Sequence, residues 1–345
     1  MVLSFEKKIF EVLKKENKEE LNKLIQLITI NFCESICCSK YSQNFIFLDL
    51  DTCELLMEIS NNEYLQKYYD NFFEIQSIAD SVKENVIKIM YETSENKENE
   101  LKYEYSVISE IISKNSKIII ENINDRYIYE PMLISCNNQR IKIDIDFISG
   151  NGGQIPDLLE ARKEKCEINL IITDQDKKYP NDNNKSSTPY KVRKKITELS
   201  LNHKHIIIDF KNIEGLVPVG VAKLKSSKSF EIFNTYYDEN DEWIKFFDFK
   251  KGITKNIYTK KDNQVSILTK SLEWWSKILN DVELKEKVEN MSDNEVFKTG
   301  LGLDISSLNL TKNNFMVDSS EKQRQEYLRI YSLIYPYIIA NDYGI

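Results

Sequence analysis

Apolar positions in the first third of the chain follow a helical period. Between Phe5 and Ile28 they fall at helical spacing, and similar stretches continue to about Ile112. The polar segment 92–100, "ETSENKENE", interrupts them and predicts a loop or a solvated helix end. We therefore expect residues 1–112 to form a mainly helical N-terminal region.

Between residues 113 and 225 the pattern changes to short β-branched runs. These runs are "KIIIE" at 117–121, "IKIDIDFI" at 141–148, "INLIITD" at 168–174 and "HIIID" at 205–209. Each interval between them can hold a helix, and Thr188-Pro189 supplies a start signal in the third, with Thr as cap and Pro in the first turn. Alternating strands and helices predict an α/β domain with a Rossmann-like parallel sheet.

The pattern weakens in the last part of the chain, residues 226–345. Segment 230–253 is aromatic and mixed, whereas segments 271–291 and 320–340 have helical spacing. We expect a mixed and helical C-terminal region there. The sequence contains no evident internal repeat.

Charge and hydropathy exclude some classes of protein. The net charge of −8 argues against a generally basic nucleic-acid binder, although an enzyme can hold nucleic acid through metal ions and a local basic patch. No apolar run approaches the ~20 residues of a transmembrane helix, and the N-terminus lacks the apolar core of a signal peptide. We expect a cytoplasmic protein without a membrane partner.

Carboxylates follow three of the four predicted strands. Glu121 ends the first run, Asp174 and Asp176 form a D-x-D after the third, and Glu214 lies a few residues past the fourth. The carboxyl ends of parallel strands meet at one edge of a sheet, where ligands bind. We therefore expect these side chains to lie close together.

Acids in this arrangement suit a hard divalent cation. Mg²⁺ and Mn²⁺ prefer oxygen ligands, and a D-x-D can share one ion or bridge two. Asp125 lies four residues after Glu121, on the same face of a helix start. Gly150, Gly152 and Gly153 come after the second strand, where they let the backbone pass close to a phosphate or to the acids.

Four segments resemble one known family. "IIIENINDRYIYEPML", "ISGNGG", "LIITDQDKKYP" and "FKNIEGLVP" are similar to the TOPRIM domain of nucleases of the overcoming-lysogenisation-defect (OLD) type and of the TOPRIM effector of PARIS anti-phage systems. The resemblance covers about residues 115–220. It implies a TOPRIM-like catalytic domain at 113–225 and metal-dependent cleavage of DNA, RNA or tRNA in antiviral defence.

The resemblance also assigns roles to single residues. It matches Glu121 to the first acid of the family, Asp125 to the second acid of the nuclease branch, Asp174 and Asp176 to its D-x-D, and Glu214 to the acid of the closing segment. These five would hold two Mg²⁺ or Mn²⁺ ions. One departure is Asn122, which stands where the family often has Gly.

Basic residues near the D-x-D are candidates for phosphate contact. Lys177 and Lys178 follow Asp176 directly and could stabilise charge on a phosphate, with Lys178 as a catalytic candidate. "KVRKK" at 191–195 is either a solvated helix face or a nucleic-acid contact made by Lys191, Arg193, Lys194 and Lys195. The two histidines, His203 and His205, are expected to be structural, because metal-ion cleavage can proceed without a histidine base.

The sequence also suggests partners and leaves two rival functions open. OLD proteins usually carry their own ATPase, yet this chain has no GxxxxGK[ST] motif, so we expect a separate ATPase subunit. Self-association into a homo-oligomer is a further hypothesis. The rivals are topoisomerase or primase chemistry on the same fold, and a non-catalytic binding or assembly module with a TOPRIM-like core. Metal dependence of any cleavage separates these functions.

Overall fold

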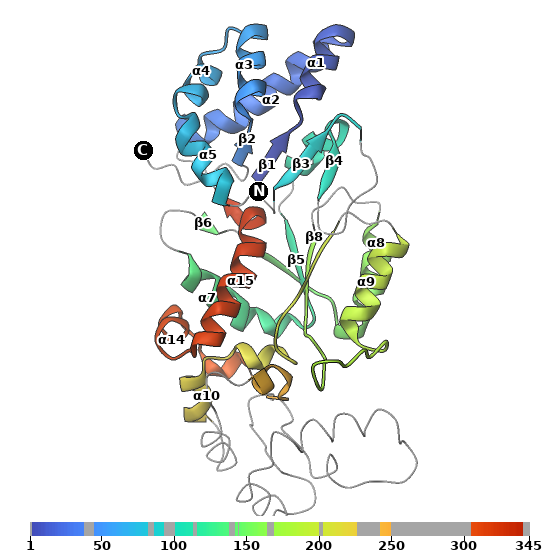
Figure 1. The fold of residues 1–345 in the computed structure, drawn as a ribbon, viewed down its shortest axis with the longest axis vertical. Coiled ribbons are helices and arrows are strands. Elements are labelled where there is room, and N and C mark those ends of the chain that lie inside the picture. Colours follow the sequence, from blue (N-terminus) through green and yellow to red (C-terminus); the bar gives the residue numbers. More distant parts are fainter. Residues whose placement is uncertain are drawn as a thin grey trace, which may run out of the picture.

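A computed structural model of the chain contains two parallel four-stranded sheets with helices packed around them (Figure 1). This is an α/β architecture, as predicted. The residues that the structure describes are 2–37, 45–81, 86–92, 101–112, 116–137, 142–143, 145–163, 169–199, 203–225, 242–249 and 305–340.

The first sheet lies in the N-terminal region. Its strand order is β2(Phe45–Phe47), β1(Val2–Phe5), β3(Ile87–Met90) and β4(Lys102–Glu104), and all neighbours are parallel. The surrounding helices are α1(Lys7–Glu16), α2(Lys18–Cys37), α3(Leu50–Ile59), α4(Glu63–Asp70), α5(Phe72–Ser81) and α6(Ile108–Ile112). The helices were predicted, but the sheet between them was not, because strands of three or four residues are too short to show a period of two.

The second sheet is the predicted one. Its order is β7(Asp146–Ser149), β5(Lys117–Ile120), β8(Asn169–Thr173) and β9(Lys204–Ile207), again all parallel. The helical elements after these strands are η3(Ile123–Asp125), α7(Arg126–Cys136), η4(Gly152–Gln154), α8(Ile155–Arg162), α9(Thr188–Glu198), η5(Ile213–Leu216) and α10(Val219–Lys225). The strand–helix alternation read from the sequence is therefore present.

The run predicted as one strand at 141–148 is divided in the structure. Its second half is β7, in which Asp146 lies opposite Lys117, the first residue of β5, and forms an ion pair with it. The short strand β6(Lys142–Ile143) instead pairs antiparallel with β10(Ile339–Ala340). The prediction of a single strand was wrong because β5 begins at Lys117 and has no residue left to pair with the earlier half.

Successive side chains of β5 point to opposite faces of the second sheet. Ile119 packs in a small core with residues of α8 and α9, including Leu159 and Val192. Ile118 and Ile120 belong to the large core that includes residues of α7 and α15(Glu321–Ile338). Helices therefore cover both faces of this sheet, as Figure 1 shows.

The C-terminal region packs against the second sheet. Its other described elements are η6(Glu242–Phe246), η8(Ile305–Leu308) and α14(Lys312–Val317). The helix predicted at 320–340 is present as α15, whereas the one predicted at 271–291 lies outside the described residues. Buried side chains of both sheets and of α15 form one continuous core. Within the described ranges, no helix is long and apolar enough to cross a membrane.

Candidate functional site

The centre of the candidate site is the carboxyl edge between β5 and β8. These strands are neighbours, but the connection from β5 leads to β7 on one side and that from β8 leads to β9 on the other. Such a switch point in strand order is where parallel sheets bind ligands. Glu121 and Asp174 directly follow the two strands, and the backbone N–H of Asp174 donates to Glu121 Oε1 at 3.0 Å. Glu121 and Asp174 are therefore brought together.

Asp125 is fixed by the turn after Glu121. Its Oδ2 accepts the backbone N–H of Asn122 at 3.0 Å, while Asn122 Oδ1 accepts the backbone N–H of Asn124 at 3.0 Å. This reciprocal capping arrangement holds the short helix η3 and buries Asp125. Asn122 has an extended backbone, with φ of −131°, so this position has no need of the glycine that the related family often has.

The D-x-D continues the ladder between β8 and β9. The backbone N–H groups of Gln175 and Asp176 donate to the carbonyls of Phe210 and Lys211, each at 3.1 Å. Asp176 then adopts a left-handed backbone with φ of 57°, a conformation that Asp tolerates better than most residues. The chain turns there, and the two acids stay at the sheet edge.

The carboxylate of Asp176 also caps a helix. Its Oδ2 accepts the backbone N–H of Thr188, the first residue of α9, at 3.1 Å. The predicted Thr cap was therefore wrong: the residue before the helix is Ser187, its side chain makes no capping hydrogen bond, and Asp176 supplies the acceptor from twelve residues away. The helix itself starts where the Thr-Pro signal predicted it.

The other four predicted acids lie close enough to Asp174 to affect it electrostatically. Burial raises the pKa of Asp174 well above its ordinary value, and the charges of its neighbours raise it further. These neighbours are Glu121, Asp125, Glu214 and Asp176. Burial also raises the pKa of Asp176, against the opposing effects of the Thr188 N–H and of the cation Lys211. The ionised form of Asp174 is thus unfavourable unless a cation compensates for it.

Two residues near these acids were not predicted. Tyr129, on α7, is 2% exposed, and burial together with the charges of Asp174 and Asp125 raises its pKa well above the ordinary value. Lys211 lies just after β9, and its Nζ lies 2.9 Å from Asp248 Oδ2 in a largely buried ion pair. Tyr129 lies one helical turn beyond Asp125, so its spacing was a usable signal. No sequence signal links Lys211 to Asp248.

The predicted glycines have different roles. A Cβ at Gly150 would lie 2.3 Å from Ile155 Cγ1, so close packing requires glycine there. Gly152 has φ of 59°, and its N–H donates to the Glu121 carbonyl at 2.8 Å, so that donor is already used within the turn. A Cβ at Gly153 would meet nothing within 4 Å, and sterics therefore do not require glycine at this position.

The predicted basic residues of α9 divide into two groups. Lys194 Nζ lies 3.4 Å from Glu198 Oε1, and Lys195 Nζ lies 3.0 Å from Glu160 Oε2 on α8. Lys191 and Arg193 are exposed on α9. Lys194 is exposed as well, so the positive charge that α9 presents to solvent comes from Lys191, Arg193 and Lys194, the last of which is paired with Glu198.

The two lysines after the D-x-D lie at its surface. Lys177 is partly exposed and Lys178 is exposed. The backbone N–H of Lys178 donates to Oδ2 of the buried Asp182 at 3.1 Å, which orders the loop that carries both cations.

His205 has the geometry of a structural residue. Its Nε2 lies 2.9 Å from Thr173 Oγ1 across the β8–β9 pair. Burial, with a smaller contribution from the charge of Arg193, lowers the pKa of His205 to about 4, so the ring is neutral at physiological pH.

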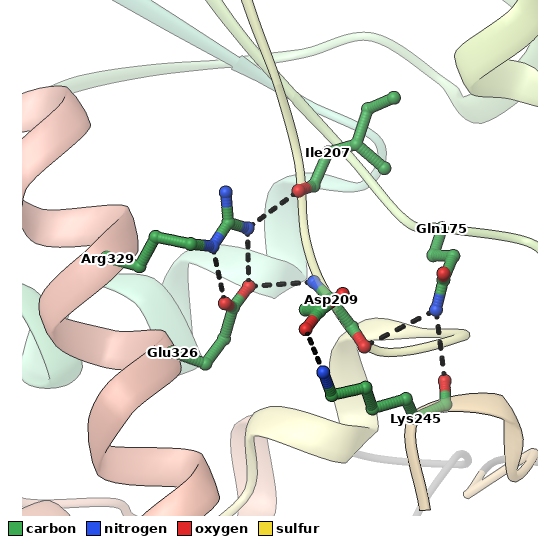
Figure 2. A network of polar contacts seen from close by, with 6 residues as sticks. All are labelled: Gln175, Ile207, Asp209, Lys245, Glu326 and Arg329. Carbon is green, nitrogen blue, oxygen red and sulfur yellow. Dashed lines mark hydrogen bonds and ion pairs between the residues drawn. The ribbon is translucent and has the colours of Figure 1, made fainter. Parts of the chain in front are cut away.

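Gln175, between the two acids of the D-x-D, anchors the loop to distant segments. It is 8% exposed, and its Nε2 donates to the carbonyls of Asp209 at 3.3 Å and Lys245 at 3.2 Å. Asp209 Oδ2 in turn lies 2.6 Å from Lys245 Nζ (Figure 2). The sequence carries no signal for this link, which joins residues 70 positions apart.

The carboxylates of the candidate site are the type of ligand that a divalent cation prefers, but their present orientations do not form a metal site. A group of carboxylates that raise the pKa of one member is a donor set that a hard cation would neutralise. However, Glu121, Asp125 and Asp176 each direct one oxygen to a backbone N–H. In the described part of the chain, no three His, Cys, Asp or Glu side chains form a group that could hold a metal ion.

The candidate site thus combines a switch point in strand order, five acids and a basic start of α9. Comparison with protein-family models, with curated proteins and with solved structures finds no match for this chain.

Proposed function

We propose that this chain is a nuclease of TOPRIM type that cleaves DNA, RNA or tRNA with the help of Mg²⁺ or Mn²⁺. The observation that supports this most is the gathering of acids from the segments after three strands around Asp174, at the switch point of a parallel sheet. A purely structural surface would not concentrate like charges in a half-buried place, because each added carboxylate makes the next harder to ionise.

Each acid has a distinct part in this proposal. Glu121 and Asp174 are the central ligands, because one hydrogen bond already joins them at adjacent strand ends. Asp125, Asp176 and Glu214 would complete the ligand set after small side-chain rotations. When bound, two such ions would supply the Lewis acidity that activates a water and stabilises the leaving oxygen of a phosphodiester.

The substrate would approach over the loop after the D-x-D and the start of α9. Lys177 and Lys178 lie next to Asp176, where a cation stabilises negative charge on a phosphate. Lys191 and Arg193, which are exposed on α9, would contact the backbone of the same nucleic acid. This local patch explains how a chain with a net charge of −8 could hold a polyanion.

The test uses the full chain with plasmid, single-stranded DNA and total tRNA, each with Mg²⁺, Mn²⁺ or a chelator. We expect cleavage of at least one substrate that the chelator abolishes. Glu121→Gln is the matched variant, because the amide oxygen can still accept the Asp174 N–H while the charge is removed. Cleavage that persists in chelator, or in this variant at equal protein concentration, would refute the proposal.

A role in anti-phage defence with a separate ATPase subunit completes the proposal. It rests on the resemblance of residues 115–220 to OLD and PARIS nucleases and on the missing phosphate-binding motif. Co-purification from the native host, with mass spectrometry and size measurement, is the direct test. We expect an ATPase in the complex, and a lone, fully active monomer would contradict this expectation.

A non-catalytic binding or assembly module is the second candidate. The observation that favours it is that Asp125 and Asp176 already serve as backbone caps, a role that needs no metal. In that case nucleic acid or a protein partner would bind without turnover, and chelator would leave the binding unchanged. The cleavage assay and a binding assay in chelator, run in parallel, separate the two candidates.

A further inference from the structure

The C-terminal helix α15 holds the turn that carries Glu214. Gln323 Nε2 donates to the Gly215 carbonyl at 2.9 Å and to the Val217 carbonyl at 2.7 Å. Tyr327 Oη donates to the Leu216 carbonyl between them at 2.8 Å. The three carbonyls directly after Glu214 thus all accept hydrogen bonds from side chains more than 100 positions away in sequence.

The Gln323 side chain is itself held in one orientation. It is 1% exposed, and its Oε1 accepts the backbone N–H groups of Ser320 at 3.1 Å and Val219 at 3.2 Å. With two N–H groups donated and two accepted, the amide uses its full hydrogen-bonding capacity. A buried and fully satisfied amide is rigid, because any rotation would leave several buried polar groups without partners.

The same helix also holds the start of this segment, as Figure 2 shows. Arg329 forms hydrogen bonds with Glu326, whose Oε1 accepts the Asp209 N–H at 2.7 Å, and Arg329 Nη2 donates to the Ile207 carbonyl at 2.8 Å. Glu326 is 5% exposed. Helix α15 therefore holds residues 207–217 at both ends, and Glu214 lies within this segment.

We propose that Gln323 is a positioning residue for Glu214. The hydrogen bonds of Gln323 fix the backbone directly after Glu214, whose side chain is 2% exposed and whose charge acts on Asp174. The inference rests on the proposed function, because it states how one member of the proposed ligand set is oriented. Groups that orient ligands in this way typically change metal affinity by about 10- to 100-fold when they are removed.

The test compares Gln323→Met with wild type in the full chain. Mn²⁺ affinity is measured by calorimetry, the Mn²⁺ dependence of cleavage by titration, and folding by thermal unfolding. We expect Mn²⁺ affinity to fall and the Mn²⁺ concentration for half-maximal cleavage to rise, each by about tenfold or more, with an unchanged KM for nucleic acid. The control is Ile334→Ala, a buried change on the same helix with no hydrogen bond to residues 215–217; it should lower the melting temperature and leave Mn²⁺ affinity unchanged.

Each outcome decides the inference. If Gln323→Met folds with wild-type Mn²⁺ affinity, the inference is overturned. If it does not fold, Tyr327→Phe replaces it, because this change removes one hydroxyl and keeps the ring; we expect the same direction of effect, and unchanged Mn²⁺ affinity would overturn the inference. If wild type neither binds Mn²⁺ nor cleaves, the proposed function fails first and the inference falls with it.

Discussion

The two sheets of this protein have the same design and differ in the residues at the carboxyl ends of their strands. Numbered in chain order within each sheet, both have the order 2-1-3-4 with all neighbours parallel. In both, a Glu directly after the first strand accepts the backbone N–H of the residue directly after the third. Tyr91 donates to Glu6 Oε2 at 3.0 Å in the first sheet, and Asp174 donates to Glu121 Oε1 at 3.0 Å in the second.

The difference lies in the residue that donates this N–H and in its surroundings. In the second sheet it is Asp174, which the other acids approach. In the first sheet it is Tyr91, whose ring stacks on Tyr105 with centroids 5.8 Å apart and lies under Lys8 Nζ at 5.5 Å. A strand-end Glu that accepts a backbone N–H is therefore a structural device of the fold. The additional acids, and not Glu121 alone, distinguish the candidate site.

The largest expected effect comes from removing the charge of Asp174, because the first sheet has Tyr91 at the equivalent position. Asp174→Asn should reduce cleavage, or toxicity in cells, to background, because it removes the charge on which the other acids act. The raised pKa means that ionised Asp174 disfavours the folded state at neutral pH, so this variant should be at least as stable as wild type in chelator. Cleavage and thermal unfolding measure the two effects. Wild-type activity at matched protein levels would remove Asp174 from the site.

Sequence patterns predicted the second sheet and missed the first for a physical reason. The runs at 117–121, 168–174 and 205–209 are rich in β-branched residues, and β5 and β8 within them are almost entirely buried, so these runs stand out from the helices between them. The strands of the first sheet have only three or four residues each and lie among strong helical patterns. The two sheets share one strand order, and only the pairing of their strands reveals this.

The acids of the candidate site could be predicted because each lies shortly after a strand of the second sheet. The contacts that hold them could not be predicted. Asp176 caps α9 from twelve positions away, and Gln323 reaches Gly215 across 108 positions, through contacts that leave no period or motif. Long-range polar contacts of this kind depend on how the elements pack, which local sequence does not encode.

The next largest effect concerns acid stability. Both histidines of the chain lie at β9, and burial lowers the pKa of His205 from 6.5 to about 4. The unfolded chain therefore binds more protons than the folded one between these values. The titration of His205 does not affect the free energy of unfolding above pH 6.5. As the pH falls from 6.5 toward about 4, it lowers the free energy of unfolding by up to about 3 kcal/mol.

The control for this prediction is His205→Gln, which can keep a hydrogen bond to Thr173 without titrating. Denaturant unfolding of both proteins across pH 4 to 7 measures the difference in their free energies of unfolding. We expect that difference to change with pH as His205 titrates. A constant difference would show that His205 does not titrate as inferred, and the acid sensitivity would then belong to the carboxylates.

A third and smaller effect concerns the basic residues of α9. Lys191, Arg193 and Lys194 are exposed, but Lys194 and Lys195 form ion pairs with Glu198 and Glu160. Alanine at the first two should weaken nucleic-acid binding about tenfold and reduce the slope of log affinity against log salt by about 1 for each phosphate interaction removed. Alanine at the second two should have a smaller effect on both.

Binding to single-stranded and duplex DNA, measured between about 50 and about 200 mM salt, tests the patch over the range where phosphate interactions matter most. All four substitutions together should weaken binding most. If neither pair changes the affinity or its salt slope, the basic start of α9 is a solvated helix face, and the substrate must approach the acids from another side.

The smallest expected effect is the most direct test of the comparison between the sheets. Glu6→Gln and Glu121→Gln are the same change at equivalent positions, and in both the amide oxygen can still accept the backbone N–H of Tyr91 or Asp174. We expect Glu6→Gln to alter the free energy of unfolding by less than about 0.5 kcal/mol and to leave cleavage unchanged. Glu121→Gln should fold equally well and not cleave. If Glu6→Gln also abolished cleavage in a folded protein, the carboxyl edge of the first sheet would be a functional site as well, and the stacked Tyr91 and Tyr105 would be the first residues to replace there.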